Sequence, residues 1–265
     1  MKTPMTYFES LNSAKNSLDR ETVHQLRKDT KQLRAHLQLL RQLRKLEGQQ
    51  KKNKLLRASV KKLARILSVH RDADVLYSLL QTLITETDDQ ELVELMTGLK
   101  NKLADKRLPP SELQQVLDLT RDIKNKSHKL LKHEPEENEI KAVLAVRLLE
   151  ICKTGEALLF SGTTDWEQLH DWRKQTKMLM YQHKMIRNQT PAELKIIQTL
   201  EGLGDELGKI NDLKILENYL KQQQLLCTRA YTHQLYQKLY SLISNHQQQH
   251  LNTCRELYSA LNPGI

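Results

Sequence analysis

The sequence predicts an all-α protein, and three features support this fold class. Helix-breaking residues are scarce, because the 265 residues include only 8 glycines and 6 prolines. Aromatic residues, which strands favour, make up only 5% of the chain. Apolar residues recur every three or four positions over long stretches, which is the spacing of one helix face. With 38% hydrophobic residues, a chain of this length can also bury a sizeable core.

Clusters of breaking and polar residues divide the chain into about eight predicted helices. The segment from Thr190 to Glu193 is a typical helix start, with an N-cap threonine, a proline at the first helical position and a glutamate three residues after the cap. Ser111 and Thr164 begin two further segments of the capping-box type. The predicted helices cover residues 5–17, 20–47, 52–84, 90–132 (interrupted near the prolines at 109–110), 136–160, 165–188, 191–222 and 228–261.

Two sequence motifs occur twice, in the same order. The first covers residues 23–33 and recurs at 169–179, which aligns His24 with His170 at a distance of 146 residues (170 − 24). The second motif covers residues 63–76 and recurs at 203–216, at a distance of 140 residues (203 − 63). A repeat of this kind indicates duplicated structural units.

We therefore predict an internally duplicated helical bundle that forms a single domain over residues 1–265. Each repeat is expected to contain about four helices, with repeat 1 at about 1–134 and repeat 2 at about 135–265. Because both repeats present the same motifs, we expect them to pack face to face around a pseudo-two-fold axis.

The first motif helix carries cations on one face and leucines on the opposite face. The stripe of cations that begins at His24 contains no acid, although like charges at i,i+4 repel by ~0.2–0.5 kcal/mol per pair. A merely solvated face would normally mix both signs of charge. Lys and Arg also exceed Asp and Glu by 42 to 32. The pattern therefore favours an anionic ligand.

Similar stripes occur on the helices at 52–84, where Lys54 belongs to the stripe, and at 165–188. The predicted anion-binding residues on the three helices are His24, Arg27, Lys28, Lys31, Arg34, Arg41, Arg57, Lys61, Arg65, His170, Arg173, Lys174, Lys177 and Lys184. Because the stripes lie opposite leucine faces, we expect eight of these cations to form one continuous surface, namely Arg27, Lys31, Arg34, Arg57, Lys61, Arg65, Arg173 and Lys177. Both histidines are expected to face a common cleft. Reversing Arg27 and Lys31 to Glu is expected to weaken binding and to leave stability nearly unchanged.

The two histidine motifs resemble the signature helices of the CHAD family (conserved histidine α-helical domain). The resemblance rests on residues 19–34 and 169–181, together with the second motifs, and spans about residues 15–220. It implies a duplicated all-helical domain with a basic central cleft or pore. It further implies that the cations and histidines above bind inorganic polyphosphate and, in some members, that the protein associates with polyphosphate granules. Gln32 and Met180 depart from the family pattern, which usually has Arg there, so both half-sites carry less charge.

Two other binding functions are alternatives. RNA could bind the same basic surface, but residues 24–45 contain no aromatic side chain for base stacking, so dedicated nucleic-acid recognition is not expected. A histidine-based metal site is the second alternative. His24 and His170 each lack a metal-binding partner at i+4, whereas His246 and His250 have that spacing within a glutamine-rich stretch.

No catalytic residue, cofactor or metal is expected, and the chain is not predicted to be an enzyme. Residues 137–141 match the ExExK string of triphosphate tunnel enzymes, but they open a predicted helix rather than lie on a strand. The pairs Arg71–Asp72 and Asn211–Asp212 are interpreted as structural contacts near helix ends.

The sequence contains no signal peptide and no apolar run long enough to span a membrane, so we expect a cytoplasmic protein without membrane partners. Its three cysteines, Cys152, Cys227 and Cys254, form no CxxC pair. They are expected to be reduced, mostly buried thiols.

Overall fold

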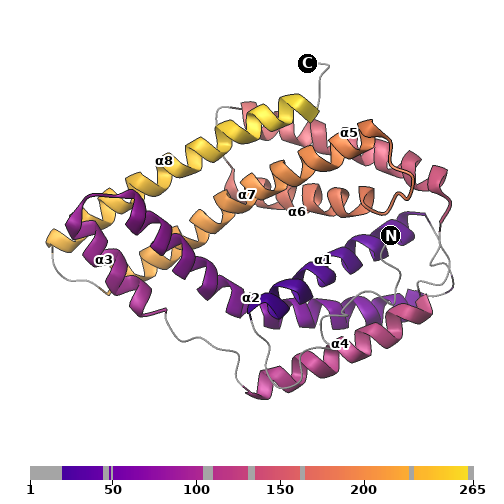
Figure 1. Ribbon diagram of the computed structural model, residues 1–265, viewed down its shortest axis with the longest axis horizontal. Helices are drawn as coiled ribbons and strands as arrows, with labels where there is room; N and C mark the ends of the chain where they lie inside the picture. Colours follow the sequence, from indigo (N-terminus) through magenta and orange to yellow (C-terminus); the bar gives the residue numbers. More distant parts are fainter. Residues whose placement is uncertain are drawn as a thin grey trace.

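The described part of the computed structural model is all-α, as predicted. It covers residues 20–43, 48, 50–103, 110–130, 135–161, 165–226 and 230–261, which form eight α-helices and no strand (Figure 1). The predicted helix at 5–17 lies outside these ranges. The helices are α1 (Arg20–Gln42), α2 (Gln50–Glu86), α3 (Gln90–Asn101), α4 (Pro110–Leu130), α5 (Glu137–Phe160), α6 (Trp166–His183), α7 (Pro191–Gln224) and α8 (Ala230–Leu261).

Side-chain caps fix several helix starts. Thr190 and Glu193 form the predicted capping box at the start of α7. At α6 the N-cap is Asp165, whose carboxylate accepts from the backbone N–H groups of Glu167 and Gln168, so the predicted cap at Thr164 is one residue too early. An aspartate at this position satisfies two N–H groups that have no partner inside the helix.

Helix α6 ends five residues before the predicted boundary at 188. Met185 and Ile186 donate backbone hydrogen bonds three residues back, to Gln182 and His183, which tightens the chain into a turn. The Gln189 side chain donates to the His183 carbonyl oxygen (3.3 Å) and so satisfies one of the last carbonyls of the helix. The apolar residues that suggested a longer helix are buried in this turn instead.

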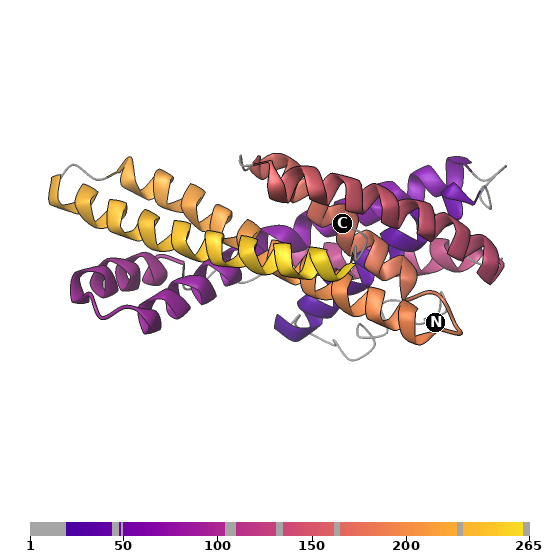
Figure 2. The ribbon, with the colours of Figure 1, turned by 90° about the horizontal axis from the view of Figure 1, so that it is seen from above.

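Three clusters of buried apolar side chains hold the helices together. The first is built by α1, the first half of α2 and α4, and it contains the predicted leucine face of α1, at most 2% exposed. The second joins the far half of α2 to α3, α7 and α8. Figure 2 shows these four segments extending together to one end of an elongated molecule.

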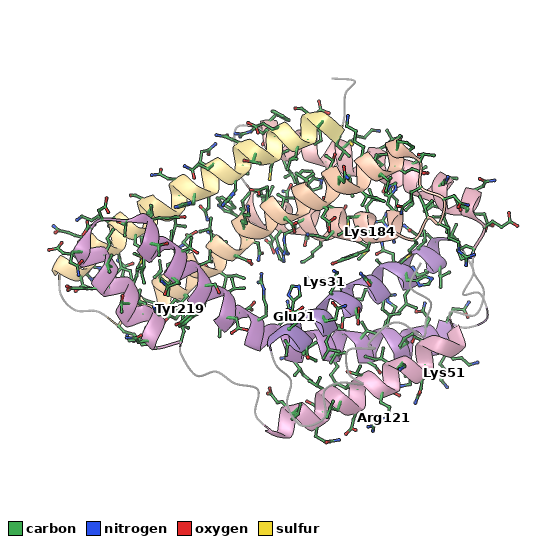
Figure 3. All side chains as sticks on the ribbon, viewed as in Figure 1. Glu21, Lys31, Lys51, Arg121, Lys184 and Tyr219 are labelled. Atoms are coloured by element: carbon green, nitrogen blue, oxygen red, sulfur yellow. The ribbon has the colours of Figure 1, made fainter. Side chains whose placement is uncertain are left out.

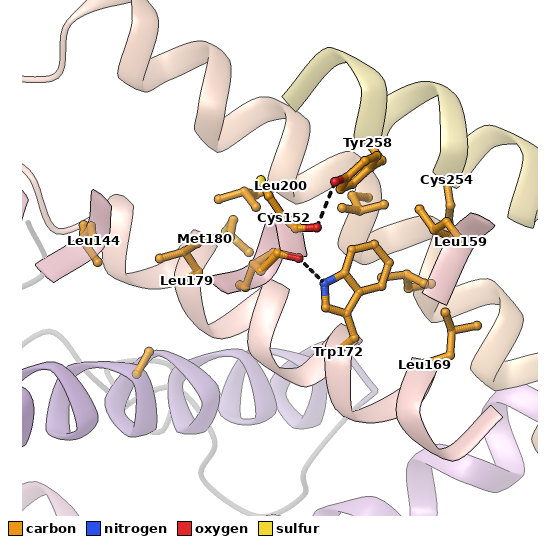
Figure 4. Close-up of a cluster of buried hydrophobic side chains, with 14 of the residues drawn as sticks. Leu144, Cys152, Leu159, Leu169, Trp172, Leu179, Met180, Leu200, Cys254 and Tyr258 are labelled. Atoms are coloured by element: carbon orange, nitrogen blue, oxygen red, sulfur yellow. Dashed lines mark hydrogen bonds between the residues drawn. The ribbon is translucent and has the colours of Figure 1, made fainter. Parts of the chain in front are cut away.

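The third cluster joins α5, α6, α7 and α8, and it also takes in Ala35 and Leu39 of α1. At its centre the Trp172 indole donates to the Ile151 carbonyl (3.0 Å), and the Tyr258 hydroxyl donates to the Cys152 carbonyl (2.8 Å; Figure 4). Because α1, α2, α7 and α8 each contribute to two clusters, the described helices share one continuous core.

The buried thiols agree with the predicted cysteine chemistry. Cys152 and Cys254 are buried and free, and burial raises the pKa of both thiols, that of Cys254 to about 12. A thiol with a raised pKa forms little reactive thiolate near neutral pH. Cys227 lies outside the described residues.

Candidate anion-binding site

A basic groove of about 970 Å³ lies between α1 and α2, with Met178 of α6 at its wall. The groove exists because both helices turn their leucine faces into the shared core and their cationic faces away from it. The described residues of its lining include neither an acid nor an aromatic residue. Five cations line it, namely Arg34, Arg41, Lys54, Arg57 and Lys61.

The five groove cations are exposed and have no ion-pair partner within the described ranges. Four of them are among the residues predicted to bind an anion. Lys54 belongs to the predicted α2 stripe but is not among the predicted binding residues. Lys54 lies one helical turn before Arg57, and this spacing could have identified it as a binding residue from the sequence. Uncompensated positive charge of this density is what a polyanion would neutralise.

A second cationic cluster lies where α1, α2 and α6 approach one another. Lys31 of α1 lies in the field of Arg27, Arg71, Arg173 and Lys177. Although water reaches the Lys31 side chain, protein atoms surround it closely. Desolvation, followed by repulsion from the neighbouring cations, lowers its pKa to about 8. Figure 3 shows Lys31 on the side of α1 that faces α6 and α7.

Arg27 and Arg173 are more deeply placed than Lys31. Arg27 donates to the Leu67 carbonyl (2.7 Å) and to the Ser68 hydroxyl (3.3 Å), so it joins α1 to α2. Desolvation is the main cause that lowers the pKa of both guanidinium groups. The Nε of Arg173 is buried and has no hydrogen-bond partner. This cluster therefore contains an unused donor and an excess of positive charge.

Arg71 belongs to the cluster although sequence reasoning did not predict it as a site residue. Its guanidinium donates to both carboxylate oxygens of Asp212 (2.6 Å each), which joins α2 to α7 across 141 residues of sequence. Arg71 also contacts Asp72, and Asn211 donates to Asp212. The pairs Arg71–Asp72 and Asn211–Asp212 therefore contact each other, which agrees with the structural role predicted for them. They lie in the middle of two long helices, however, and not near helix ends.

Acids neutralise most of the cationic stripe on α6. Lys174 pairs with Asp171 on its own helix (2.8 Å), and Lys184 pairs with Glu201 of α7 (2.8 Å). Lys177 pairs with Asp205, and its aliphatic stem lies against Gly204 of α7, where a Cβ would come within 2.8 Å of it. The α6 stripe therefore differs from the α1 and α2 stripes, because its charges are compensated within the protein.

The two histidines lie in different surroundings. His24 is exposed on α1. His170 lines a separate pocket of about 230 Å³ between α6 and α7, beside Trp166 and Lys214. Burial, and then the charges of Lys174 and Arg173, lower the pKa of His170, which favours the neutral imidazole. No residue of α1 lines this pocket, so neither of the two pockets brings the histidines into the common cleft that we expected.

The remaining predicted residues, Lys28 and Arg65, are exposed and lie outside the groove lining. His246 and His250 each face a different carboxylate, Glu86 of α2 and Glu206 of α7 respectively. These carboxylates lie on separate helices, and the described residues contain no cluster of three His, Cys, Asp or Glu side chains that could hold a metal ion.

The ExExK string of residues 137–141 forms the first turn of α5, as expected of a helix start. Glu139 takes part in a capping box there, and Lys141 pairs with Glu137 and Glu193.

Among the described helices, none combines the length and the apolar character that a membrane crossing requires.

These helices and their cationic faces define the chain as an all-α bundle with an extended basic groove. The family model of the CHAD domain matches residues 8–221, and the chain belongs to the CHAD family. Its fold is similar to the crystal structure of the CHAD domain from the plant Ricinus communis. The TM-score is 0.70 at 18% sequence identity, over 97% of this chain and 88% of that chain. Comparison with curated proteins gives no significant match.

Proposed function

We propose that the protein binds inorganic polyphosphate and that the groove between α1 and α2 is its main binding surface. The observation that carries this proposal is the groove lining, in which the described residues include five cations and no acid, and the cations pair with no described carboxylate. Polyphosphate is an evenly charged chain without bases, so a row of Arg and Lys side chains can neutralise it and release its condensed counterions. Arg adds paired hydrogen bonds to phosphate oxygens, and Lys adds mobile charges.

We propose that the bound chain continues from the groove to the central cluster, which would make the site a basic cleft. Lys31 lies one helical turn before Arg34, which lines the groove. Met178, at the groove wall, directly follows Lys177 of the cluster. Residues from both halves of the chain would then contact one ligand.

The lining favours polyphosphate over RNA. Proteins that bind single-stranded nucleic acids stack the bases on aromatic side chains, and none is found among the described residues that line the groove. RNA binding through the backbone charge alone remains the alternative function, and a direct comparison of the two ligands distinguishes them. Association with polyphosphate granules in the cytoplasm is the corresponding proposal for the cell, which microscopy of a fluorescent fusion would test.

We also propose that the fold is duplicated, with α1 and α2 of repeat 1 corresponding to α6 and α7 of repeat 2. Helix α7 packs along α8, whereas α2 packs along α3 and α4. The broken pair α3–α4 would thus take the place of the continuous α8. Superposing residues 20–84 on 165–222 in a crystal structure would test this correspondence.

The binding experiment compares long polyphosphate, RNA and ATP over a range of salt concentrations. Arg57 and Lys61 are exposed on α2 and line the groove, so the double variant Arg57→Glu, Lys61→Glu should weaken polyphosphate binding by at least about tenfold. Because the variant would neutralise about two fewer phosphate groups, the slope of log affinity against log salt should become shallower by about one and a half to two.

The matched control is the double variant Lys52→Glu, Lys62→Glu. These lysines are exposed on the same helix but lie outside the groove lining, and the change in net charge is the same. Equal losses of affinity in both double variants would mean that net charge alone attracts the ligand. Tighter binding of RNA than of polyphosphate at every salt concentration would support the alternative function.

A further inference from the structure

One face of α5 carries apolar side chains that no other described helix covers. Val146, Leu149 and Phe160 are 58%, 64% and 55% exposed, and exposed alanines lie beside them on the same face. The opposite face of α5 is buried against α6 and α8. Figure 2 shows the helix along an edge of the molecule. Large apolar side chains that gather on one exposed helix face, between charged residues, often mark a surface that binds a partner.

We propose that this face of α5 is a dimer interface, on which a second copy of the chain packs its own α5 in the antiparallel direction. The two-fold axis would pass near residue 151. Ala142 and Phe160 stand at the two ends of the apolar stripe, and the midpoint between them is position 151. An antiparallel pair centred there places each large Phe160 ring against the small Ala142 of the other copy.

The charged residues of the stripe point to the same axis. Glu150 and Lys153 are exposed on this face, and neither forms an ion pair with any described residue. The midpoint between them lies half a residue beyond position 151, which is about 1 Å along the helix. The same antiparallel arrangement therefore places Lys153 of each copy beside Glu150 of the other. The size pairing and the pairing of Glu150 with Lys153 are both compatible with one two-fold axis near residue 151, as expected of a self-complementary interface.

A single pair of helices buries less surface than the ~1,200–2,000 Å² of a standard stable interface. We therefore expect a reversible dimer that dissociates on dilution. This expectation makes the concentration dependence of the molecular mass the property to measure.

Sedimentation velocity over a wide concentration range, without polyphosphate, tests the proposal. The parent chain should shift from monomer to dimer as concentration rises, and Leu149→Glu should stay monomeric because it places an acid at the centre of the apolar stripe. Leu226→Glu is the matched control, since Leu226 is 76% exposed in the turn after α7 and should leave the dimer intact. Unchanged helical content and melting temperature would show that both variants are folded.

Charge exchange tests the axis itself. Lys153→Glu places acid beside acid, and Glu150→Lys places lysine beside lysine, so each variant alone should dimerise at least about fivefold more weakly. A mixture of the two should form heterodimers, and the double exchange Glu150→Lys, Lys153→Glu should restore self-association. A parent chain that is monomeric at every concentration would overturn the proposal and would leave the stripe to a different protein or a lipid surface. A dimer unaffected by Leu149→Glu, or single variants that do not complement each other, would overturn it too.

Discussion

Lys31 lies among four other cations, so its protonation depends on what occupies the space between them. Burial and the charges of Arg27, Arg173, Arg71 and Lys177 lower its pKa to about 8, from the 10.5 of a free lysine. Between these two pH values the unfolded chain holds a proton that the folded chain has released. The lysine therefore makes the folded state more stable as pH rises from about 8 to 10.5. A bound polyanion acts in the opposite direction on Lys31, because its negative charge favours the protonated lysine.

From this linkage we predict that polyphosphate affinity falls as pH rises from 7 to 9. Near pH 7 most Lys31 side chains carry a charge, whereas near pH 9 ligand binding must first protonate them. Lys31→Arg should make the affinity nearly independent of pH over this range, because a guanidinium stays protonated. Fluorescence anisotropy at constant ionic strength would measure both proteins. A parent affinity that is constant from pH 7 to 9 would show that Lys31 does not contact the ligand.

Arg27 shows why a cation on a helical stripe is not necessarily free to bind. It is half-buried, and its hydrogen bonds to Leu67 and Ser68 hold α1 against α2. Reversing Arg27 would leave the Leu67 carbonyl without this donor and would place a carboxylate in its location, at a cost of about 1–3 kcal/mol. The expectation that Arg27 and Lys31 can be reversed without loss of stability therefore does not fit the structure. Arg57 and Lys61 make no such bond to a described residue, so they are the cleaner test of binding.

At the scale of elements, the bridge between Arg71 and Asp212 holds α2 and α7 together at the centre of the molecule. Their side chains are only 24% and 19% exposed. Asp212 is also the carboxylate that most offsets the lowered pKa of Arg173. A single acid therefore compensates charge that comes from two other helices.

We predict that Asp212→Asn lowers the free energy of unfolding by about 1–3 kcal/mol, because it removes the shorter of the two carboxylate contacts of Arg71 and leaves only the longer one to Asp72, among other cations. Asp171→Asn is the control, since Asp171 pairs with Lys174 on an exposed surface and its loss should leave the free energy of unfolding nearly unchanged. Chemical denaturation would measure both. Saturating polyphosphate should raise the melting temperature of Asp212→Asn more than that of the parent, because phosphate replaces the lost counter-charge. Equal stability of the two variants would contradict this role of the bridge.

Most helices could be predicted from the sequence, because their limits depend on local chemistry. Thr190 and Pro191 define the start of α7, and Pro110 is the first residue of α4. The end of α6 was missed because burial of Met185 and Ile186 in a turn depends on the rest of the fold. Local sequence contains no information on such tertiary burial.

The site was predicted less completely than the helices, for a related reason. A helical wheel identifies which residues share a face, and it correctly grouped Arg34 with Arg41, and Arg57 with Lys61. A helical wheel cannot identify which other helix packs against that face. Glu201 and Asp205 of α7 neutralise the stripe of α6, and only the packing of α6 against α7 places them there. The ion pair between Arg71 and Asp212 could not be predicted for the same reason, because it depends on how α2 packs against α7.

Across the whole molecule, positive charge is therefore unequally available in the two halves. The cations of the groove have no ion-pair partner among the described residues, whereas Lys174 of α6 and Lys184, its C-cap, already have carboxylate partners. A polyanion gains little from a lysine whose charge is compensated within a few ångströms, because the carboxylate repels the phosphate as strongly as the ammonium attracts it. We therefore predict that the first half contributes most of the binding energy.

The double variant Lys174→Glu, Lys184→Glu tests this asymmetry against Arg57→Glu, Lys61→Glu, since both reverse two exposed charges and change the net charge equally. The α6 variant should lose less than about threefold in polyphosphate affinity and keep the parent's salt dependence, because no condensed counterion is displaced at a site that is already neutral. The groove variant should lose at least about tenfold. Titration calorimetry at two salt concentrations would measure both affinities together with the binding stoichiometry. If the α6 variant lost as much affinity as the groove variant, Asp171 and Glu201 would have to release their lysines when the ligand binds. The two halves would then act as equal partners around one polyphosphate chain.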